Sequence, residues 1–133
     1  MNALRPFHDD TIIGYEVDCD KRSITLYIRP AHWREQQEVT RIKFSGVAGY
    51  HFKDDAFSNV IMQIEEVPAD TFIARFGAEL AESFRTDGTI GELAKNDNDA
   101  QRAIRDLKLK AIVIESVMGL NGWLIAKDFA ISI

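Results

Sequence analysis

Three histidines and three pairs of adjacent carboxylates are the side chains of this sequence whose types could do chemistry. The histidines are His8, His32 and His51, and the densest group of possible metal ligands is His8-Asp9-Asp10. Adjacent residues of an extended chain point to opposite sides, so these three side chains converge on one ion only if a turn folds them. The sequence has no HExxH or CxxC spacing and no calcium-type loop. We therefore expect no metal and no cofactor.

The carboxylate pairs are Asp9-Asp10, Asp54-Asp55 and Glu65-Glu66. Glycoside hydrolysis requires two carboxyl groups that face each other across a cleft, and sequence neighbours do not do so. A solvated surface is the usual environment of such pairs, and binding to a partner is the functional alternative. The candidate binding residues are His8, Asp9, His51, Asp54, Asp55, Glu65 and Glu66.

Nucleophilic and phosphate-binding motifs are also missing from the sequence. The single cysteine, Cys19, stands between Asp18 and Asp20, whereas activation of a thiolate requires electropositive surroundings. There is no GxSxG elbow and no glycine-rich loop with a P-loop lysine. We therefore expect a non-enzymatic protein. The alternative is a small-molecule-binding or enzymatic domain whose site is assembled from separate strands, with the polar groups His8, Asp9, His51 and Glu65.

The charge of the chain is unevenly distributed. The net charge is −5, and residues 53–100 carry eleven acidic and four basic side chains. Binding to a nucleic-acid backbone requires an excess of lysine and arginine, so this acidic stretch argues against such a partner. It is compatible with a basic protein partner, because complementary charges steer association. A surface that only keeps the protein soluble is the simpler interpretation of the same charges.

The size and composition indicate one globular domain, spanning residues 1–133. Apolar residues make up 46% and charged residues 28% of the chain, which is ordinary for a globular protein. The N-terminus has no apolar signal core, and the longest apolar runs are four residues against about twenty for a membrane span. One cysteine cannot form an intramolecular disulfide. We expect a cytoplasmic protein.

Alternating apolar and polar residues predict strands in the first part of the chain. The first strand alternates from Ile13 to Cys19, and Ile13, Tyr15, Val17 and Cys19 are expected to form its buried face. A second strand, from Ile24 to Arg29, completes a hairpin.

Three more strands are predicted before the centre of the chain. They cover residues 41–44, 50–52 and 59–67, and a bend or bulge at Gly46 and Gly49 separates the first two. In the third strand, Val60, Met62 and Ile64 are expected to share one face.

The period then changes to that of a helix. Apolar residues repeat every four positions between Pro68 and Gly88, which predicts an amphipathic helix whose apolar stripe packs on the sheet. The stripe consists of Phe72, Phe76, Leu80 and Phe84.

The last third of the chain predicts a short helix and a hairpin. Asp97-Asn98-Asp99 offers caps for a helix that continues to about Asp106. The strand over residues 107–116 is apolar on both faces at Ala111–Ile114 and is therefore central, and Asn121-Gly122 is a turn before a last strand interrupted by Lys127. The sequence thus predicts an α+β fold, with a largely antiparallel sheet of six or seven strands and one main helix.

Several segments resemble small bacterial proteins of unknown function, among them immunity proteins of polymorphic toxin systems. They are Phe7-His8-Asp9-Asp10, Ile42-Lys43-Phe44-Ser45-Gly46-Val47, Tyr50-His51-Phe52, Asn59-Val60-Ile61 and Gly119-Leu120-Asn121-Gly122-Trp123. The resemblance implies one α+β domain without catalytic residues. For an immunity protein, it also implies a surface that blocks a toxin, with a basic toxin domain as the possible partner. A structural subunit that dimerises through a sheet edge is a third hypothesis.

Overall fold

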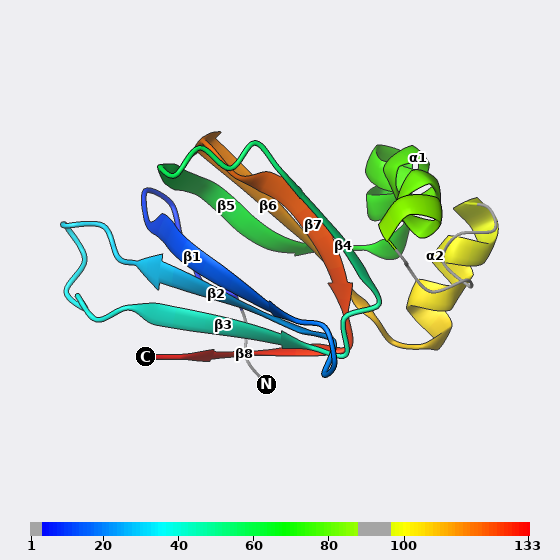
Figure 1. Ribbon diagram of the computed structural model, residues 1–133, viewed down its shortest axis with the longest axis horizontal. Helices are drawn as coiled ribbons and strands as arrows, with labels where there is room; N and C mark the ends of the chain where they lie inside the picture. The colour runs from blue at the N-terminus through cyan, green and yellow to red at the C-terminus, as the bar shows by residue number, and fades with distance from the viewer. Residues whose placement is uncertain (1–3, 88–96) are drawn as a thin grey trace.

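The protein is an antiparallel β structure with two helices at one end (Figure 1). The computed structural model describes residues 4–87 and 97–133, and within them there are eight strands and two helices. The strands are β1 (Thr11–Asp18), β2 (Ser23–Arg29), β3 (Thr40–Ser45), β4 (Gly49–Lys53), β5 (Asn59–Val67), β6 (Lys110–Met118), β7 (Asn121–Ala126) and β8 (Asp128–Ser132). The helices are α1 (Ala69–Asp87) and α2 (Asp97–Asp106).

The predicted α+β class and the antiparallel sheet are confirmed. The sheet has more strands than the expected six or seven, because the last predicted strand is two strands, β7 and β8, separated at Lys127. The short helix expected after Asp97 is α2. The predicted stop of the main helix at Gly88 lies outside the described residues.

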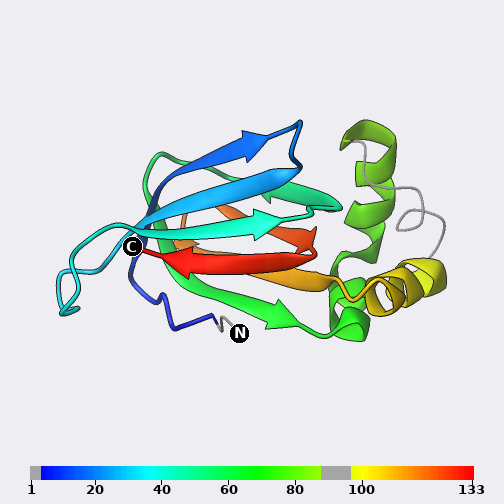
Figure 2. The same ribbon diagram turned by 90° about the horizontal axis from the view of Figure 1, so that it is seen from below.

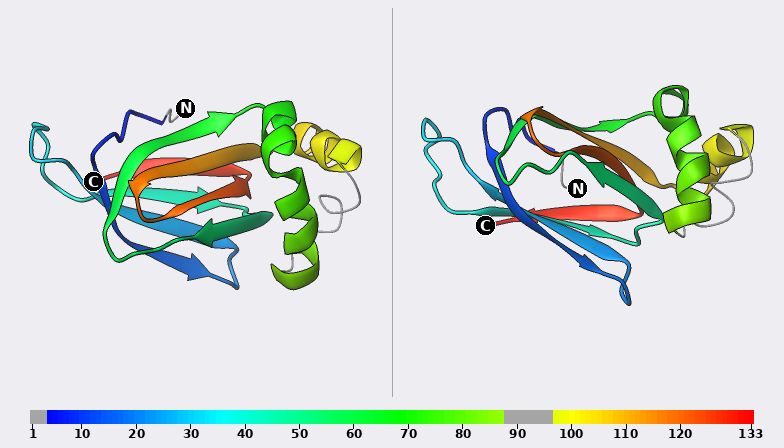
Figure 3. Two further views of the ribbon diagram at one scale, coloured as in Figure 1. Left: turned by 90° about the horizontal axis from the view of Figure 1, so that it is seen from above. Right: turned by 45° about the horizontal axis from the view of Figure 1, so that its top comes forward.

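The strands form one sheet in the order β4-β7-β6-β5-β1-β2-β3-β8, which is folded into two layers. Figure 2 shows β1, β2, β3 and β8 side by side in the near layer, and the left view of Figure 3 shows β5, β6, β7 and β4 in the other. Only two residue pairs, Thr11 with Val60 and Ile12 with Asn59, join β1 to β5. Beyond this short junction the layers separate, so the interior of a sandwich lies between them.

The two layers are also joined by a bent ribbon. β3 continues into β4, and β7 continues into β8. The β3–β4 segment pairs with the β7–β8 segment on both sides of the bend. At the bend, the Lys127 N–H donates to the Ser45 carbonyl at 3.0 Å. Gly46 has a φ of 62°, and a Cβ there would lie 2.8 Å from the Cβ of Lys127. Glycine therefore allows the close approach that turns the ribbon from one layer into the other.

A first hydrophobic core fills the space between the layers. One layer contributes Ile24, Leu26, Ile28, Ile42 and Phe44, and the other contributes Ile61, Ile64, Ile112, Ile114 and Leu124. The alternation predicted for β2 and β3 is confirmed, since these apolar side chains are buried and their neighbours point outward.

A second core lies on the outer face of the β4-β7-β6-β5 layer, under the helices. Ala111, Val113, Trp123 and Ile125 pack there against α1 and α2. Residues Ala111–Ile114 are buried on both faces of β6, as the sequence predicted for a central strand. Both helices cover only one end of this layer, which we call the helix-proximal end (Figure 3). The opposite end, the helix-distal end, holds the β2–β3 and β4–β5 loops and the β6–β7 turn.

The face predicted to be buried in the first strand is exposed. Ile13, Tyr15 and Val17 are each more than a third exposed, and Cys19 is exposed as well. A bulge between Ile12 and Gly14 turns Tyr15 and Val17 toward the inner face, opposite Leu26 and Ile24. β1 has no second neighbour beyond Ile12, so this part of the inner face lies at an open edge and stays accessible to water.

The face predicted for β5 is also wrong. The register with β6 changes on both sides of Ile61, and Met62 is the one residue of β5 that is left without a partner there. This single insertion shifts the phase of β5, so Ile61 and Ile64 are both buried while Met62 is exposed. A period-two pattern cannot reveal such an inserted residue, because each bulge exchanges the two faces.

The aromatic stripe of α1 is unequally buried. Phe72 is 0% exposed against Trp123, whereas Phe76 is half-buried beneath the Arg75 guanidinium. Phe84 lies outside the residues whose side chains the structure describes.

We expect Phe72→Ala to lower the free energy of unfolding by about 3–5 kcal/mol, because it leaves a cavity between α1 and Trp123. Phe76→Ala should cost less than about 2 kcal/mol, since part of its ring is already hydrated. Urea denaturation of the two variants measures both values. Equal losses would contradict the difference in burial.

Candidate functional site

Asp10 is a buried carboxylate next to two of the predicted site residues, His8 and Asp9. Its side chain is 0% exposed, and Oδ1 accepts from Arg34 Nε at 2.6 Å and from the Ala31 N–H at 2.8 Å. Oδ2 accepts from Arg5 Nη1 at 3.2 Å. A buried carboxylate needs such charged and polar partners to offset its lost hydration. Asp10 therefore fastens the N-terminal segment to the β2–β3 loop.

The two arginines extend this clamp. Arg34 Nη2 also donates to the Pro6 carbonyl at 2.9 Å, and Arg5 Nη2 donates to Thr40 Oγ1 at 3.2 Å. The charged side chains of the clamp therefore bond to one another and to nearby protein groups. The role of the clamp is to hold the chain that carries His8 and Asp9.

His8 and Asp9 lie on the surface beside β5. His8 Nε2 is 3.4 Å from Asp9 Oδ1, and its Nδ1 is 3.3 Å from the Met62 carbonyl oxygen. A hollow of about 490 Å³ between the N-terminal segment and β5 is lined by both His8 and Glu65. Glu65 Oε1 accepts from Gln63 Nε2 at 3.2 Å. The structure thus brings three of the predicted residues to one side of β5.

His51 lies apart from this group. It is on β4, at the other edge of its layer, with its ring 6.2 Å from that of Trp123. Because neighbouring strands are spaced by about 4.8 Å, three strand spacings separate β4 from β5 by roughly 14 Å. The constellation of His8, Asp9, His51 and Glu65 that an enzymatic site would use is therefore not gathered. Among the described residues, no group of three His, Cys, Asp or Glu side chains could hold a metal ion.

The four carboxylates of Asp54-Asp55 and Glu65-Glu66 do not form one patch. Asp54 and Asp55 lie in the β4–β5 loop, where Asp54 lines a hollow with Arg75 and Glu79 of α1 and Asp55 is bonded to Asn59 at the start of β5. Glu66 is exposed near the other end of β5. With a rise of about 3.3 Å per residue, the length of β5 separates Asp55 from Glu66 by roughly 20 Å. A partner that contacts one pair need not contact the other.

The β4–β5 loop is organised by a buried amide. Asn59 Oδ1 accepts the N–H of Leu120 at 2.9 Å and of Ala56 at 3.3 Å. Asn59 Nδ2 donates to Asp55 Oδ1 at 3.1 Å, and the Phe57 N–H donates to the same oxygen at 3.0 Å. Asn59 is 5% exposed. One side chain therefore ties the loop to the β6–β7 turn.

The same hydrogen bonds determine the protonation states of Asp55 and Tyr15. The hydrogen bonds from the Phe57 N–H and from Asn59 hold the pKa of Asp55 below its ordinary value. Tyr15 donates its hydroxyl to Asp55 Oδ2 at 3.3 Å, and burial followed by the Asp55 charge raises the pKa of Tyr15. At neutral pH, Asp55 is therefore an anion and Tyr15 is a neutral donor.

Large apolar side chains are exposed around this loop. Phe57 is 100% exposed, and Val117 and Met118 at the end of β6 are 60% and 56% exposed. Met118 pairs with Val60, the residue that follows Asn59. Ile13 is also exposed, and it follows Ile12, which pairs with Asn59. We call the group of Ile13, Phe57, Val117 and Met118 the distal patch.

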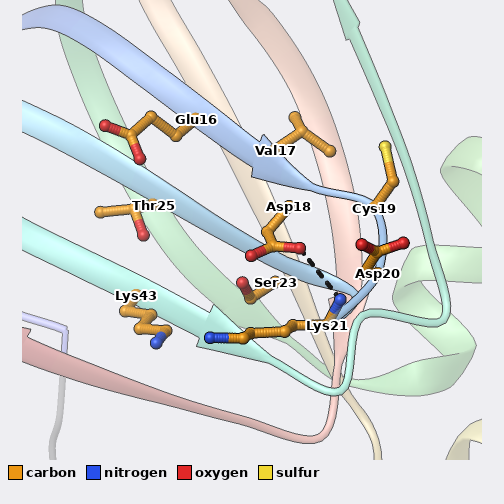
Figure 4. A pocket seen from close by; sticks show the side chains of 9 residues that line it. All are labelled: Glu16, Val17, Asp18, Cys19, Asp20, Lys21, Ser23, Thr25 and Lys43. Atoms are coloured by element: carbon orange, nitrogen blue, oxygen red, sulfur yellow. Dashed lines mark hydrogen bonds between the residues drawn. The ribbon is translucent and has the colours of Figure 1, made fainter.

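Another hollow lies at the helix-proximal tip of the β1–β2 hairpin, with a volume of about 570 Å³. Figure 4 shows Glu16, Thr25 and Lys43 in a row across three strands, with the Lys21 N–H donating to Asp18 Oδ1 in the turn. It is an open surface feature with polar walls. None of the predicted site residues lines it.

Sequence reasoning missed Asn59, Phe57 and the role of Asp10. The sequence favours a solvated surface for the pair Asp9-Asp10, although a carboxylate directly before a strand can also be a buried anchor. Asn59 is the first residue of an apolar strand. That its amide binds the preceding loop becomes evident only when the neighbouring strands are known, and the sequence does not show them. Phe57 is an aromatic residue inside a charged loop, and this signal was available from the sequence.

Comparisons with protein-family models, with curated proteins and with solved structures found no match to this chain. No helix within the described residues has the length and apolar character that crossing a membrane requires.

We expect Asp10→Asn to lower the free energy of unfolding by about 3–5 kcal/mol, because it leaves two arginines beside a neutral, partly unsatisfied group. Asp9→Asn is the matched control, with an exposed side chain and an expected change below about 0.5 kcal/mol. Urea denaturation at neutral pH measures both. A small loss for Asp10→Asn would show that the clamp is dispensable.

Asp55 should make stability depend on pH at the acidic end. Its lowered pKa in the folded state means that its contribution is present above its ordinary pKa of 3.8 and is lost as pH falls through the folded value. Asp55→Asn should therefore flatten the decrease of stability below about pH 4 relative to the wild type. Thermal unfolding between pH 2 and pH 6 tests this, with Asp54→Asn as the control.

Proposed function

We propose that this protein acts by binding another protein and performs no catalysis, with neutralisation of a bacterial toxin as the specific form of this function. The observation that carries the proposal is the distribution of exposed apolar side chains. Among the residues whose burial the structure describes, ten large apolar side chains are exposed, and six of them belong to segments at the helix-distal end. They are Ile13, Trp33, Phe57, Val117, Met118 and Ile133.

Apolar side chains gathered in this way favour protein binding. Isolated exposed apolar residues are normal, but groups of them mark interaction sites, and aromatic residues and methionine are enriched in interfaces. In contrast, the polar residues considered for catalysis are spread between β4 and the opposite side of β5. The resemblance to toxin-immunity proteins supports neutralisation as the form of binding.

The experiment is a neutralisation assay with a partner from the source organism. The full chain is expressed there with an affinity tag, and proteins recovered in stoichiometric amounts are produced separately in a host that lacks both genes. For a toxin, growth should stop when the partner is expressed alone and recover when this protein is co-expressed. Calorimetry should then give a 1:1 complex.

Two results would contradict the proposal. One is the absence of any stoichiometric complex in the source organism. The other is a purified protein that turns over a small molecule, with activity lost in both His8→Ala and Glu65→Gln, which would favour the enzymatic alternative.

A further inference from the structure

Phe57 is the most exposed of the large apolar side chains that the structure describes. It is 100% exposed, and its backbone has a φ of 61°. A left-handed conformation is unfavourable for a bulky residue, and a fully hydrated phenyl ring contributes nothing to either core. The folded protein on its own therefore gains no stability from a phenylalanine at this position.

The conformation is nevertheless fixed by the surrounding structure. The Phe57 N–H is held by Asp55 Oδ1, and Asp55 is held in turn by Asn59 Nδ2. Gly119 lies against the same amide, since a Cβ at this glycine would be 2.2 Å from Asn59 Oδ1. A buried amide therefore presents an apolar ring to solvent in one defined backbone conformation. An unfavourable conformation that the surroundings enforce is a reason to ask for a function.

Other exposed apolar residues lie near the loop that carries Phe57, because the register of three strands brings them to the start of β5. Ile12 pairs with Asn59, and Val60 pairs with both Thr11 and Met118. Ile13 and Met118 therefore flank the start of β5, immediately after the loop that carries Phe57. The register therefore brings exposed apolar residues of β1 and β6 to the start of β5, next to the β4–β5 loop.

We propose that the distal patch is the surface on which this protein docks its partner, with Phe57 as the anchor, and that the partner is a folded protein with an apolar pocket flanked by lysine or arginine. This inference rests on the proposed function and names its surface. A protruding ring requires a pocket, and buried aromatic anchors in pockets contribute most of the affinity in many interfaces.

The charge beside the anchor defines the rim of that pocket. Asp54 and Asp55 are on the same loop, and the hydrogen bonds to Asp55 keep it ionised. Lys53 precedes them but is directed to Glu79, with Nζ 3.4 Å from Oε1. Asp55 therefore places a carboxylate directly beside the apolar anchor, whereas Asp54 lines a hollow with Arg75 and Glu79 of α1, and a basic rim complements the Asp55 side.

A second copy of this chain fits the patch less well. A two-fold contact centred on Phe57 would place one protruding ring against the other and the carboxylates of one loop near those of its mate. An anionic membrane surface is disfavoured by the same carboxylates. Both are outcomes that the experiment distinguishes.

The test begins with p-benzoylphenylalanine at position 57 of the full chain, expressed in the source organism and irradiated. The matched control carries the same group at Leu107, an exposed apolar residue after α2. The protein that crosslinks through position 57, and not through position 107, is then produced separately and titrated against variants.

Phe57→Ser should weaken binding by about 30-fold or more, the usual effect of losing an anchor residue. Met118→Ser should weaken it by a smaller factor, and Leu107→Ser should leave it within about twofold. Asp54→Asn should slow association at low salt, whereas Glu66→Gln at the other end of β5 should not. Phe57→Gly separates folding from binding, because glycine accepts the left-handed conformation: its unfolding midpoint should be unchanged or higher while its affinity falls.

The outcomes separate the surface from the function. A stoichiometric partner whose affinity is unchanged by Phe57→Ser and Met118→Ser overturns the docking surface and leaves the proposed function in place. A crosslink to a second copy, or binding to phosphatidylcholine–phosphatidylserine vesicles that Phe57→Ser abolishes, overturns the inferred partner. The absence of any stoichiometric complex overturns both proposals.

Discussion

The bend at Gly46 and Lys127 is the constraint on which the rest of the structure depends. One antiparallel ribbon supplies β3 and β8 to one layer and β4 and β7 to the other. A strand pair that changes layers must bend sharply, and the 2.8 Å approach to Lys127 leaves no room for a side chain at position 46. The other connection between the layers, from β1 to β5, is only two residue pairs long. The ribbon is therefore the main link that holds the layers face to face over the first core.

The layered arrangement makes the two ends of the molecule different. At the helix-proximal end, α1 and α2 cover the outer core around Trp123. Neither of the two described helices packs at the helix-distal end, and there the loops are held by buried polar side chains, Asp10 for the β2–β3 loop and Asn59 for the β4–β5 loop. Rigid loops that expose apolar residues are suited to recognition, because little conformational entropy is lost when a partner binds.

The alternating pattern predicted the wrong buried face in strands that contain a bulge or lie at an open edge of the sheet. The buried faces of β2 and β3 and the central position of Ala111–Ile114 were predicted correctly, because these strands are paired on both sides and no inserted residue interrupts β2, β3 or this part of β6. β1 and β5 contain bulges, which change the face of every later residue. Tyr15 and Val17 in addition lie at an edge that no neighbouring strand covers, and coverage by a distant strand is not encoded in a local pattern.

The sequence by itself determined the α+β class, the hairpins, the amphipathic helix and the central position of Ala111–Ile114, because these follow from local periods of two and about four residues. It also identified Gly46 as a bend and Asp54 and Asp55 as members of a charged loop. The turn predicted at Asn121-Gly122 is wrong, since these residues begin β7 and the chain turns at Gly119-Leu120. Only the tertiary structure decided that Asp10 is a buried clamp, that Asp55 and Glu66 lie at opposite ends of β5, and that Ile13 and Met118 flank the start of β5 after the loop that carries Phe57. These facts depend on strand order and register, which join residues up to about a hundred positions apart in the chain.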